Sequence, residues 1–131
     1  RHTRADVLRA VYEGCIFAHN RHVRRLYVFR APPATIRLTG GAARSAVWAQ
    51  MFADVFQVPV EIPAGQELGA LGAAIAAAVA CGIYPSLEEA VRGMTRIERT
   101  HVPDPERGAL HAARYTRYSE ACRQLRPFFT A

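Results

Sequence analysis

Two short apolar segments, each followed by a longer stretch of helical periodicity, constrain the fold of this chain most strongly. Residues 35–39 (Thr-Ile-Arg-Leu-Thr) and residues 59–62 are short and rich in β-branched side chains, which predicts strands. The periodicity predicts helices over residues 43–56 and 66–81. Strands that alternate with helices indicate an α/β fold with a parallel pair of strands. Because two strands are too few for a complete domain sheet, we expect an incomplete sheet flanked by helices.

Three further helices are predicted from their periodicity and their start and stop signals. The chain begins with one long helix, for which Thr3 and Asp6 form a start that resembles a capping box. Ser86 is expected to cap a shorter helix, which carries two glutamates in its first turn. A last helix covers residues 106–125, and Pro127 is expected to end it. The predicted chain order is helix, strand, helix, strand and then three helices.

The composition is that of a folded globular protein. Half of the 131 residues are hydrophobic and 21% are charged, which excludes a disordered chain. The three cysteines lie far apart and form no CxxC pair, so we expect neither a disulfide framework nor a zinc site, and a reducing cytoplasm fits best. The apolar stretch of residues 68–79 is too short to span a bilayer, which needs about 20 residues. Because the chain opens at Arg1 directly into a helical pattern, we interpret it as a fragment of a longer protein.

The chain is basic, with a formal net charge of +6 and arginine as its sole source of Lys or Arg charge. Such a balance is found in proteins that bind nucleic acid, and residues 21–30 form a basic run. A run of this kind is more often a solvated helix face, and no nucleic-acid-binding motif accompanies it. We therefore consider nucleic acid an unlikely partner and keep a basic nucleic-acid-binding module as an alternative.

A glycine-containing turn between a predicted strand and a predicted helix is the most informative segment (Leu-Thr-Gly-Gly-Ala-Ala-Arg-Ser, residues 38–45). Ligands of open α/β sheets bind at the carboxyl ends of strands, where a following helix offers free N–H groups. Gly40 and Gly41 lack the Cβ atoms that would hold a ligand away from the backbone. Ala42 keeps the wall small, and Ser45 places a hydroxyl on the first helical turn. The segment is neither a Walker A loop nor GxGxxG, and a tight turn without a ligand is the simpler alternative.

A second segment of small residues follows at residues 67–74 (Glu-Leu-Gly-Ala-Leu-Gly-Ala-Ala). Gly69 and Gly72 lie three residues apart on one face of a predicted helix, where each glycine costs about 1 kcal/mol relative to alanine. Close packing against a helix or a sheet is the preferred explanation. Close approach of a nucleotide to the start of the helix is the alternative.

With both segments in place, the chain resembles the C-terminal domain of the FGGY carbohydrate kinases. The resemblance covers nearly the whole chain with its segments in order. It rests on residues 38–60 (LTGGAARSAVWAQMFADVFQVPV), 67–74 (ELGALGAA), 9–17 (RAVYEGCIF) and 83–94 (IYPSLEEAVRGM), with Tyr115 and Tyr118 in the tail. Within the family, the residues of the tail and of the segment 40–54 are most similar to those of the xylulose and L-xylulose kinases.

The resemblance implies an actin-like, ribonuclease H-like ATPase fold of two domains with a cleft between them. Residues 1–131 would be a fragment of the C-terminal, nucleotide-binding domain, and the N-terminal domain, which binds most of the sugar, would be absent. By match to the family motif, Gly40, Gly41, Ala42 and Ser45 would line the adenine-nucleotide site. The whole protein would be a cytoplasmic transferase that phosphorylates a ketopentose such as xylulose, with ATP and Mg²⁺. The oligomeric state stays open, with a homodimer as one alternative.

The resemblance also implies that catalysis depends on residues outside this chain. Phosphoryl transfer needs a base near the sugar hydroxyl and loops that hold the phosphates. The aspartates here are Asp6, Asp54 and Asp104, and none matches the family's catalytic base. We therefore assign no catalytic residue and expect the fragment alone to be inactive. An actin-like ATPase that uses nucleotide only as a switch is the alternative within the same fold.

Four polar side chains invite a functional interpretation and have a simpler structural one. His19 and His22 have helical i, i+3 spacing that would suit two metal ligands, but no third ligand is evident, so we assign no metal site. Asp54 lies in an otherwise apolar helix, where we expect it to be hydrogen-bonded for structural reasons. Glu13 is expected to form a salt bridge with a neighbouring arginine.

Overall fold

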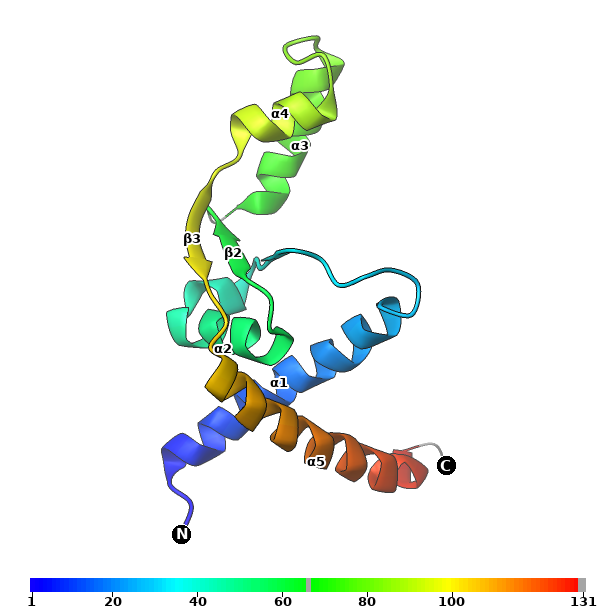
Figure 1. The fold of residues 1–131 in the computed structure, drawn as a ribbon. Helices are drawn as coiled ribbons and strands as arrows, with labels where there is room; N and C mark the ends of the chain where they lie inside the picture. The colour runs from blue at the N-terminus through cyan, green and yellow to red at the C-terminus, as the bar shows by residue number, and fades with distance from the viewer. Residues whose placement is uncertain (66, 130–131) are drawn as a thin grey trace.

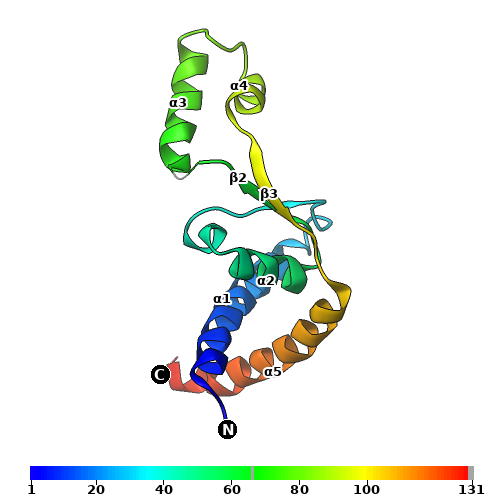
Figure 2. The same cartoon turned by 90° about the vertical axis from the view of Figure 1, so that its left-hand side faces the viewer.

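The computed structural model describes residues 1–65 and 67–129 and has an α/β architecture (Figure 1). The elements in chain order are α1 (Arg4–Leu26), β1 (Ile36–Arg37), the 3₁₀ turn η1 (Gly41–Arg44), α2 (Ala46–Phe56), β2 (Val60–Pro63), α3 (Leu68–Ala80), α4 (Leu87–Met94), β3 (Ile97–His101) and α5 (Pro105–Phe129). Helices α3 and α4 lie at one end of the sheet, and α1, α2 and α5 lie at the other (Figures 1 and 2). Within this described part of the chain, no helix is both long and apolar enough to cross a membrane.

The sheet contains the two predicted strands and one that the sequence did not indicate. Strands β1 and β2 pair in parallel, with Ile36 opposite Val60, so the predicted parallel pair is confirmed. The strand order is β1-β2-β3, and β3 runs antiparallel to β2. Strand β3 (Ile-Glu-Arg-Thr-His) contains a single apolar residue, so it shows no apolar alternation. Its strand conformation depends on pairing with β2.

The predicted helix starts are largely confirmed. Thr3 and Asp6 form a capping box: the backbone N–H of Thr3 donates to Asp6 Oδ2 at 2.8 Å, and the N–H of Asp6 donates to Thr3 Oγ1 at 3.3 Å. Ser86 caps α4, because its Oγ accepts the N–H of Glu89 at 3.2 Å. Helix α3 is described from Leu68, and its predicted first residue, Gln66, lies outside the described residues.

Two predicted helix boundaries were wrong. The helix expected over residues 43–56 is divided: η1 is followed by Ser45 in an extended conformation (φ −102°, ψ 112°), and α2 begins only at Ala46. Pro127 does not end the last helix, because α5 continues to Phe129. Pro127 lacks the N–H that would donate one backbone hydrogen bond, and only Phe128 and Phe129 follow it in α5, so the disruption is confined to the end of the helix.

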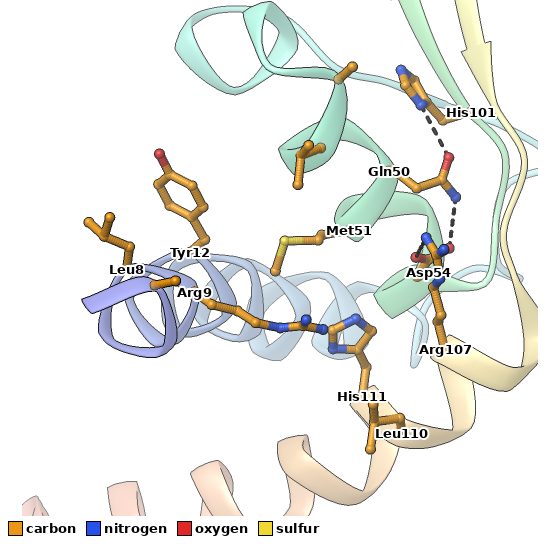
Figure 3. A pocket seen from close by; sticks show the side chains of 13 residues that line it. Leu8, Arg9, Tyr12, Gln50, Met51, Asp54, His101, Arg107, Leu110 and His111 are labelled. Atoms are coloured by element: carbon orange, nitrogen blue, oxygen red, sulfur yellow. Dashed lines mark hydrogen bonds and ion pairs between the residues drawn. The ribbon is translucent and has the colours of Figure 1, made fainter. Parts of the chain in front are cut away.

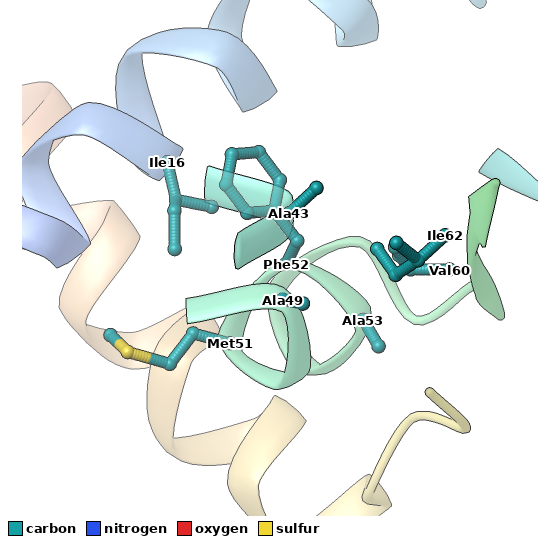
Figure 4. Close-up of a cluster of buried hydrophobic side chains, with 8 residues drawn as sticks. All are labelled: Ile16, Ala43, Ala49, Met51, Phe52, Ala53, Val60 and Ile62. Atoms are coloured by element: carbon teal, nitrogen blue, oxygen red, sulfur yellow. The ribbon is translucent and has the colours of Figure 1, made fainter. Parts of the chain in front are cut away.

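The core forms around α2, which contacts α1, α5, η1, β2 and β3. Five residues of α2 are buried, and four of them, Met51 to Asp54, are consecutive, because neighbours cover α2 on several sides. The cluster of buried apolar side chains comprises Ile16, Ala43, Ala49, Met51, Phe52, Ala53, Val60 and Ile62 (Figure 4). Helix α1 contributes to it through Ile16, which is fully buried. Burial of this apolar surface is the main favourable term that holds the helices to the sheet.

Replacing Ile16 with alanine tests this core. We expect Ile16→Ala to lower the free energy of unfolding by about 3 kcal/mol, because it removes buried methyl groups and leaves a cavity. Leu26→Ala is the matched control, since Leu26 lies on the same helix with 63% of its surface exposed. Urea unfolding followed by circular dichroism measures both. Equal losses for the two variants would contradict the described packing of α1.

Candidate functional site

A groove with a volume of about 360 Å³ lies at the carboxyl end of β1. Its walls come from the turn after β1 (Thr39, Gly40 and Arg44), from the start of α3 (Leu68) and from β3 (Arg99). The structure thus brings together segments that are about sixty residues apart in the chain. Their meeting place is the edge at which α/β sheets bind ligands.

Gly40 and Gly41 differ in backbone conformation within this turn. Gly40 has a φ of +79°, a conformation that a residue with a side chain adopts only with strain. Gly41 has no such backbone conformation, and a Cβ atom added there would meet no atom within 4 Å. Neither the backbone nor the packing of the described residues therefore requires glycine at position 41. The space outside Gly41 is open to another molecule.

The four predicted site residues are not equally placed in the groove. Gly40 lines it, whereas Gly41, Ala42 and Ser45 do not. Ala42 is half-buried and packs against the core cluster. Ser45 was expected on the first turn of a helix, but it is the N-cap of α2, and its Oγ accepts the N–H of Trp48 at 3.3 Å. The hydroxyl hydrogen of Ser45 is still available to donate.

Sequence reasoning missed Arg99. Its Nη2 donates to the carbonyl oxygen of Ala43 at 2.9 Å, so a side chain of β3 holds the turn that contains Gly41. Two residues further along β3, His101 Nδ1 lies 3.2 Å from Gln50 Oε1 on α2. No local signal indicates these contacts, because they join segments that are far apart in the chain.

The glycine pair of α3 is not explained by packing. Gly69 and Gly72 are exposed, and a Cβ added at either would meet no atom within 4 Å among the described residues. Close packing within the described part of the chain, the preferred explanation, therefore does not account for these two glycines. Most of α3 is exposed, and its buried residues are Ile75 and Ala78.

A larger pocket lies elsewhere among the described residues, between α1, α2, the end of β3 and the start of α5 (Figure 3). It has a volume of about 1000 Å³, and Leu8, Tyr12, Met51 and Leu110 form much of its apolar wall. None of the four predicted site residues lines it. The size of this pocket therefore does not bear on the prediction at the glycine turn.

Asp54 lies at the polar end of this large pocket and is engaged in structural hydrogen bonds. Its side chain is 1% exposed, and its Oδ1 accepts from Gln50 Nε2 at 2.8 Å and from the N–H of Asp104 at 2.9 Å. A buried carboxylate is costly unless it is hydrogen-bonded in this way. The expectation of a structural role for Asp54 is confirmed.

The other two aspartates also have structural partners. Asp6 belongs to the capping box of α1, and Asp104 Oδ1 accepts the N–H groups of Glu106 and Arg107 at the start of α5. All three aspartates are thus engaged at helix starts or in the core. Over residues 1–65 and 67–129, no group of three or more His, Cys, Asp or Glu side chains is arranged to hold a metal ion.

Glu13 is the centre of a partly buried ion-pair cluster. Its Oε1 lies 2.9 Å from Arg9 Nε, contacts Arg114 Nη1 and lies 3.7 Å from His111 Nδ1. The expected salt bridge with an arginine is confirmed. Burial lowers the pKa of His111 below its ordinary value of 6.5, and the Glu13 carboxylate offsets this effect only in part.

Comparison with known proteins shows the family to which the chain belongs. The sequence model of the FGGY family of carbohydrate kinases, C-terminal domain, matches residues 1–81. The chain is 41% identical over 127 residues to the L-xylulose/3-keto-L-gulonate kinase of Escherichia coli K12, a match that covers 97% of this chain and 26% of that protein. It is 37% identical over 109 residues to the autoinducer-2 kinase of the same strain, covering 82% of this chain and 21% of that protein.

The fold also matches part of a solved sugar kinase. The crystal structure of xylulose kinase from Rhodospirillum rubrum superposes with a TM-score of 0.84 and 32% sequence identity, over 99% of this chain and 26% of that one. The predicted α/β fold, part of an actin-like ATPase domain, is therefore confirmed. The chain belongs to the FGGY family of carbohydrate kinases, and it spans about a quarter of the length of the relatives that it matches.

Burial of His111 beside Glu13 predicts that the stability of the fold depends on pH. A histidine with a lowered pKa binds fewer protons in the folded state than in the unfolded state. Stability is therefore lost as the pH falls from above 6.5 towards the lowered pKa of His111. We expect His111→Gln to reduce the loss of urea-unfolding free energy between pH 8 and about pH 5.5.

The control for this prediction is His22→Gln, because His22 is exposed on α1. This variant should keep the pH dependence of the original chain. If His111→Gln shows the same loss of stability as the original chain, the pH dependence does not come from His111.

Proposed function

We propose that this chain is the nucleotide-binding part of an ATP-dependent sugar kinase, with the adenine nucleotide held at the groove beside the glycine turn. We assign Gly40, Gly41, Ala42 and Ser45 to this site. The observation that carries the assignment is the open space outside Gly41, where glycine is required neither by backbone conformation nor by packing. A nucleotide that lies against this backbone would explain the absence of a side chain.

The remaining contacts of the turn are compatible with this role. Gly40 opens the turn and lines the groove. Ala42 packs inward with a small side chain, so it leaves the approach to Gly41 clear. The Ser45 hydroxyl, which already accepts the N–H of Trp48, can donate its hydrogen to a ring nitrogen or an oxygen of the nucleotide.

The proposed substrate is a ketopentose such as xylulose. Its support is that one relative is an L-xylulose/3-keto-L-gulonate kinase and that a structural neighbour is a xylulose kinase. Another relative is an autoinducer-2 kinase, so a substrate other than a ketopentose is the alternative. In this proposal Mg²⁺ accompanies the phosphates of ATP, as is usual in phosphoryl transfer. The unpaired state of the three cysteines is in keeping with a cytoplasmic enzyme.

Enlarging the side chain at position 41 tests the nucleotide site. We expect Gly41→Leu to weaken binding of the non-hydrolysable ATP analogue AMP-PNP by roughly tenfold or more, which is about 1.4 kcal/mol. Gly41→Ala should have a smaller effect in the same direction. Titration calorimetry measures each affinity. The fold should be unchanged, since the added side chain would enter open space.

The control is Gly14→Leu on α1, where an added Cβ would also meet no atom within 4 Å. This variant should bind AMP-PNP like the original chain. If Gly41→Leu binds as tightly as the original, the nucleotide does not lie against the glycine turn.

The 131-residue chain by itself should transfer no phosphate. Its aspartates are engaged in helix caps and in the core, and we assign none of them to take the proton of a sugar hydroxyl. A coupled assay for ADP release, with and without L-xylulose or D-xylulose, measures this. Sugar-dependent turnover by the purified chain would contradict the assignment of catalysis to other parts of the enzyme.

A further inference from the structure

Strand β3 presents two half-buried polar side chains on one face: Arg99 contacts the turn that carries the proposed nucleotide site, and His101 contacts the helix that follows it. Arg99 and His101 alternate with the exposed residues Glu98 and Thr100. Side chains two residues apart in a strand lie on the same face of the sheet. This face is turned towards η1 and α2, as the contacts of Arg99 with Ala43 and of His101 with Gln50 establish.

The Arg99 contact is made at the centre of η1. Its guanidinium Nη2 lies 2.9 Å from the carbonyl oxygen of Ala43, which is 8% exposed and belongs to the core cluster. A charged donor forms a stronger hydrogen bond than a neutral one, and it does so here in a partly buried place. Ala43 is two residues from Gly41, so this bond restrains the backbone beside the open space.

The second contact holds the helix that follows. Gln50 lies within hydrogen-bond distance of His101 and also donates through Nε2 to the carbonyl oxygen of Val102 at 2.8 Å. The turn and the helix are thus joined to β3 at separate points. Strand β3 lies outside residues 1–81, which the family's C-terminal domain matches, so the family match does not include this support.

We propose that Arg99 is a positioning residue for the nucleotide site, holding η1 in its binding conformation through the Ala43 carbonyl. This inference rests on the proposed function. It adds that the affinity for nucleotide depends on a side chain from a strand far along the chain. The contribution is made through the backbone of the turn and is therefore the same for adenosine, ADP and ATP.

Direct contact with phosphate is the competing role for Arg99. Its side chain lines the groove and has no carboxylate partner among the described residues, as is also the case for Arg44. A residue that binds phosphate would affect ATP and ADP more than adenosine. The bond from Nη2 to Ala43 favours the positioning role, because it commits part of the guanidinium to the turn.

The test compares Arg99→Met, which keeps a long apolar side chain and removes the donor, with Arg99→Lys, which keeps a donor. Titration calorimetry with adenosine, ADP and AMP-PNP gives the affinities. We expect Arg99→Met to weaken all three ligands by the same factor, roughly tenfold, as for loss of a hydrogen bond to a charged group. Arg99→Lys should restore most of the affinity. Arg117→Met, which removes one exposed charge on α5, should leave all three affinities unchanged.

Three results would overturn the positioning role. The first is unchanged affinity in Arg99→Met. The second is a loss that increases from adenosine to ADP to AMP-PNP, which would make Arg99 a phosphate ligand. Equal losses without rescue by lysine, together with a lower free energy of unfolding, would also overturn it, because they would reduce Arg99 to a general stabilising residue.

Amide hydrogen exchange separates this inference from the proposed function. In the ligand-free chain, Arg99→Met should speed exchange at the amides of Ala43 and Ser45, while α3 exchanges as before. If the original chain binds neither adenosine nor its phosphates, the proposed nucleotide site fails. In that case hydrogen exchange alone tests the role of Arg99, because unchanged exchange at the amides of Ala43 and Ser45 would show that Arg99 does not hold the turn.

Discussion

Burial of α2 is the constraint on which the rest of this structure depends. The helix lies against α1, α5 and the sheet, and the largest buried apolar cluster of the described residues forms around it. Ile16 reaches the cluster from α1, and Val60 and Ile62 reach it from β2. Because α2 follows η1 after a single residue, Ser45, the burial of α2 also fixes the direction in which the glycine turn leaves β1.

Polar contacts along α2 determine where the C-terminal part of the chain joins this core. Asp54 accepts the N–H of Asp104, and the Gln57 amide donates to the carbonyl oxygens of Asp54 and Asp104. Glycine at position 108 of α5 leaves room for the Gln57 side chain, because a Cβ atom there would lie only 2.1 Å from Gln57 Nε2. These bonds satisfy polar groups that burial would otherwise make costly. They also bring β3 beside the turn that carries Gly41.

The sequence indicated the glycine turn as a candidate site, but it did not indicate the residue of β3 that contacts this turn. The glycine pair between a strand and a helix has a local signature, and the backbone geometry of Gly40 agrees with it. Ser45 was predicted on the first turn of the helix, whereas its hydroxyl caps α2, because the helix begins one residue after it. Arg99 has no local signature at all. It belongs to a strand with a polar sequence that exists through its pairing with β2.

The sequence by itself determined the α/β class, the parallel pair of strands and the starts of α1 and α4. These features follow from apolar periodicity and from capping side chains within four residues of their partners. Only the tertiary structure decided the third strand, the 3₁₀ turn before α2 and the support of that turn by Arg99. Each depends on contacts between segments that are distant in the chain, and the energy of such contacts is not encoded in any local pattern.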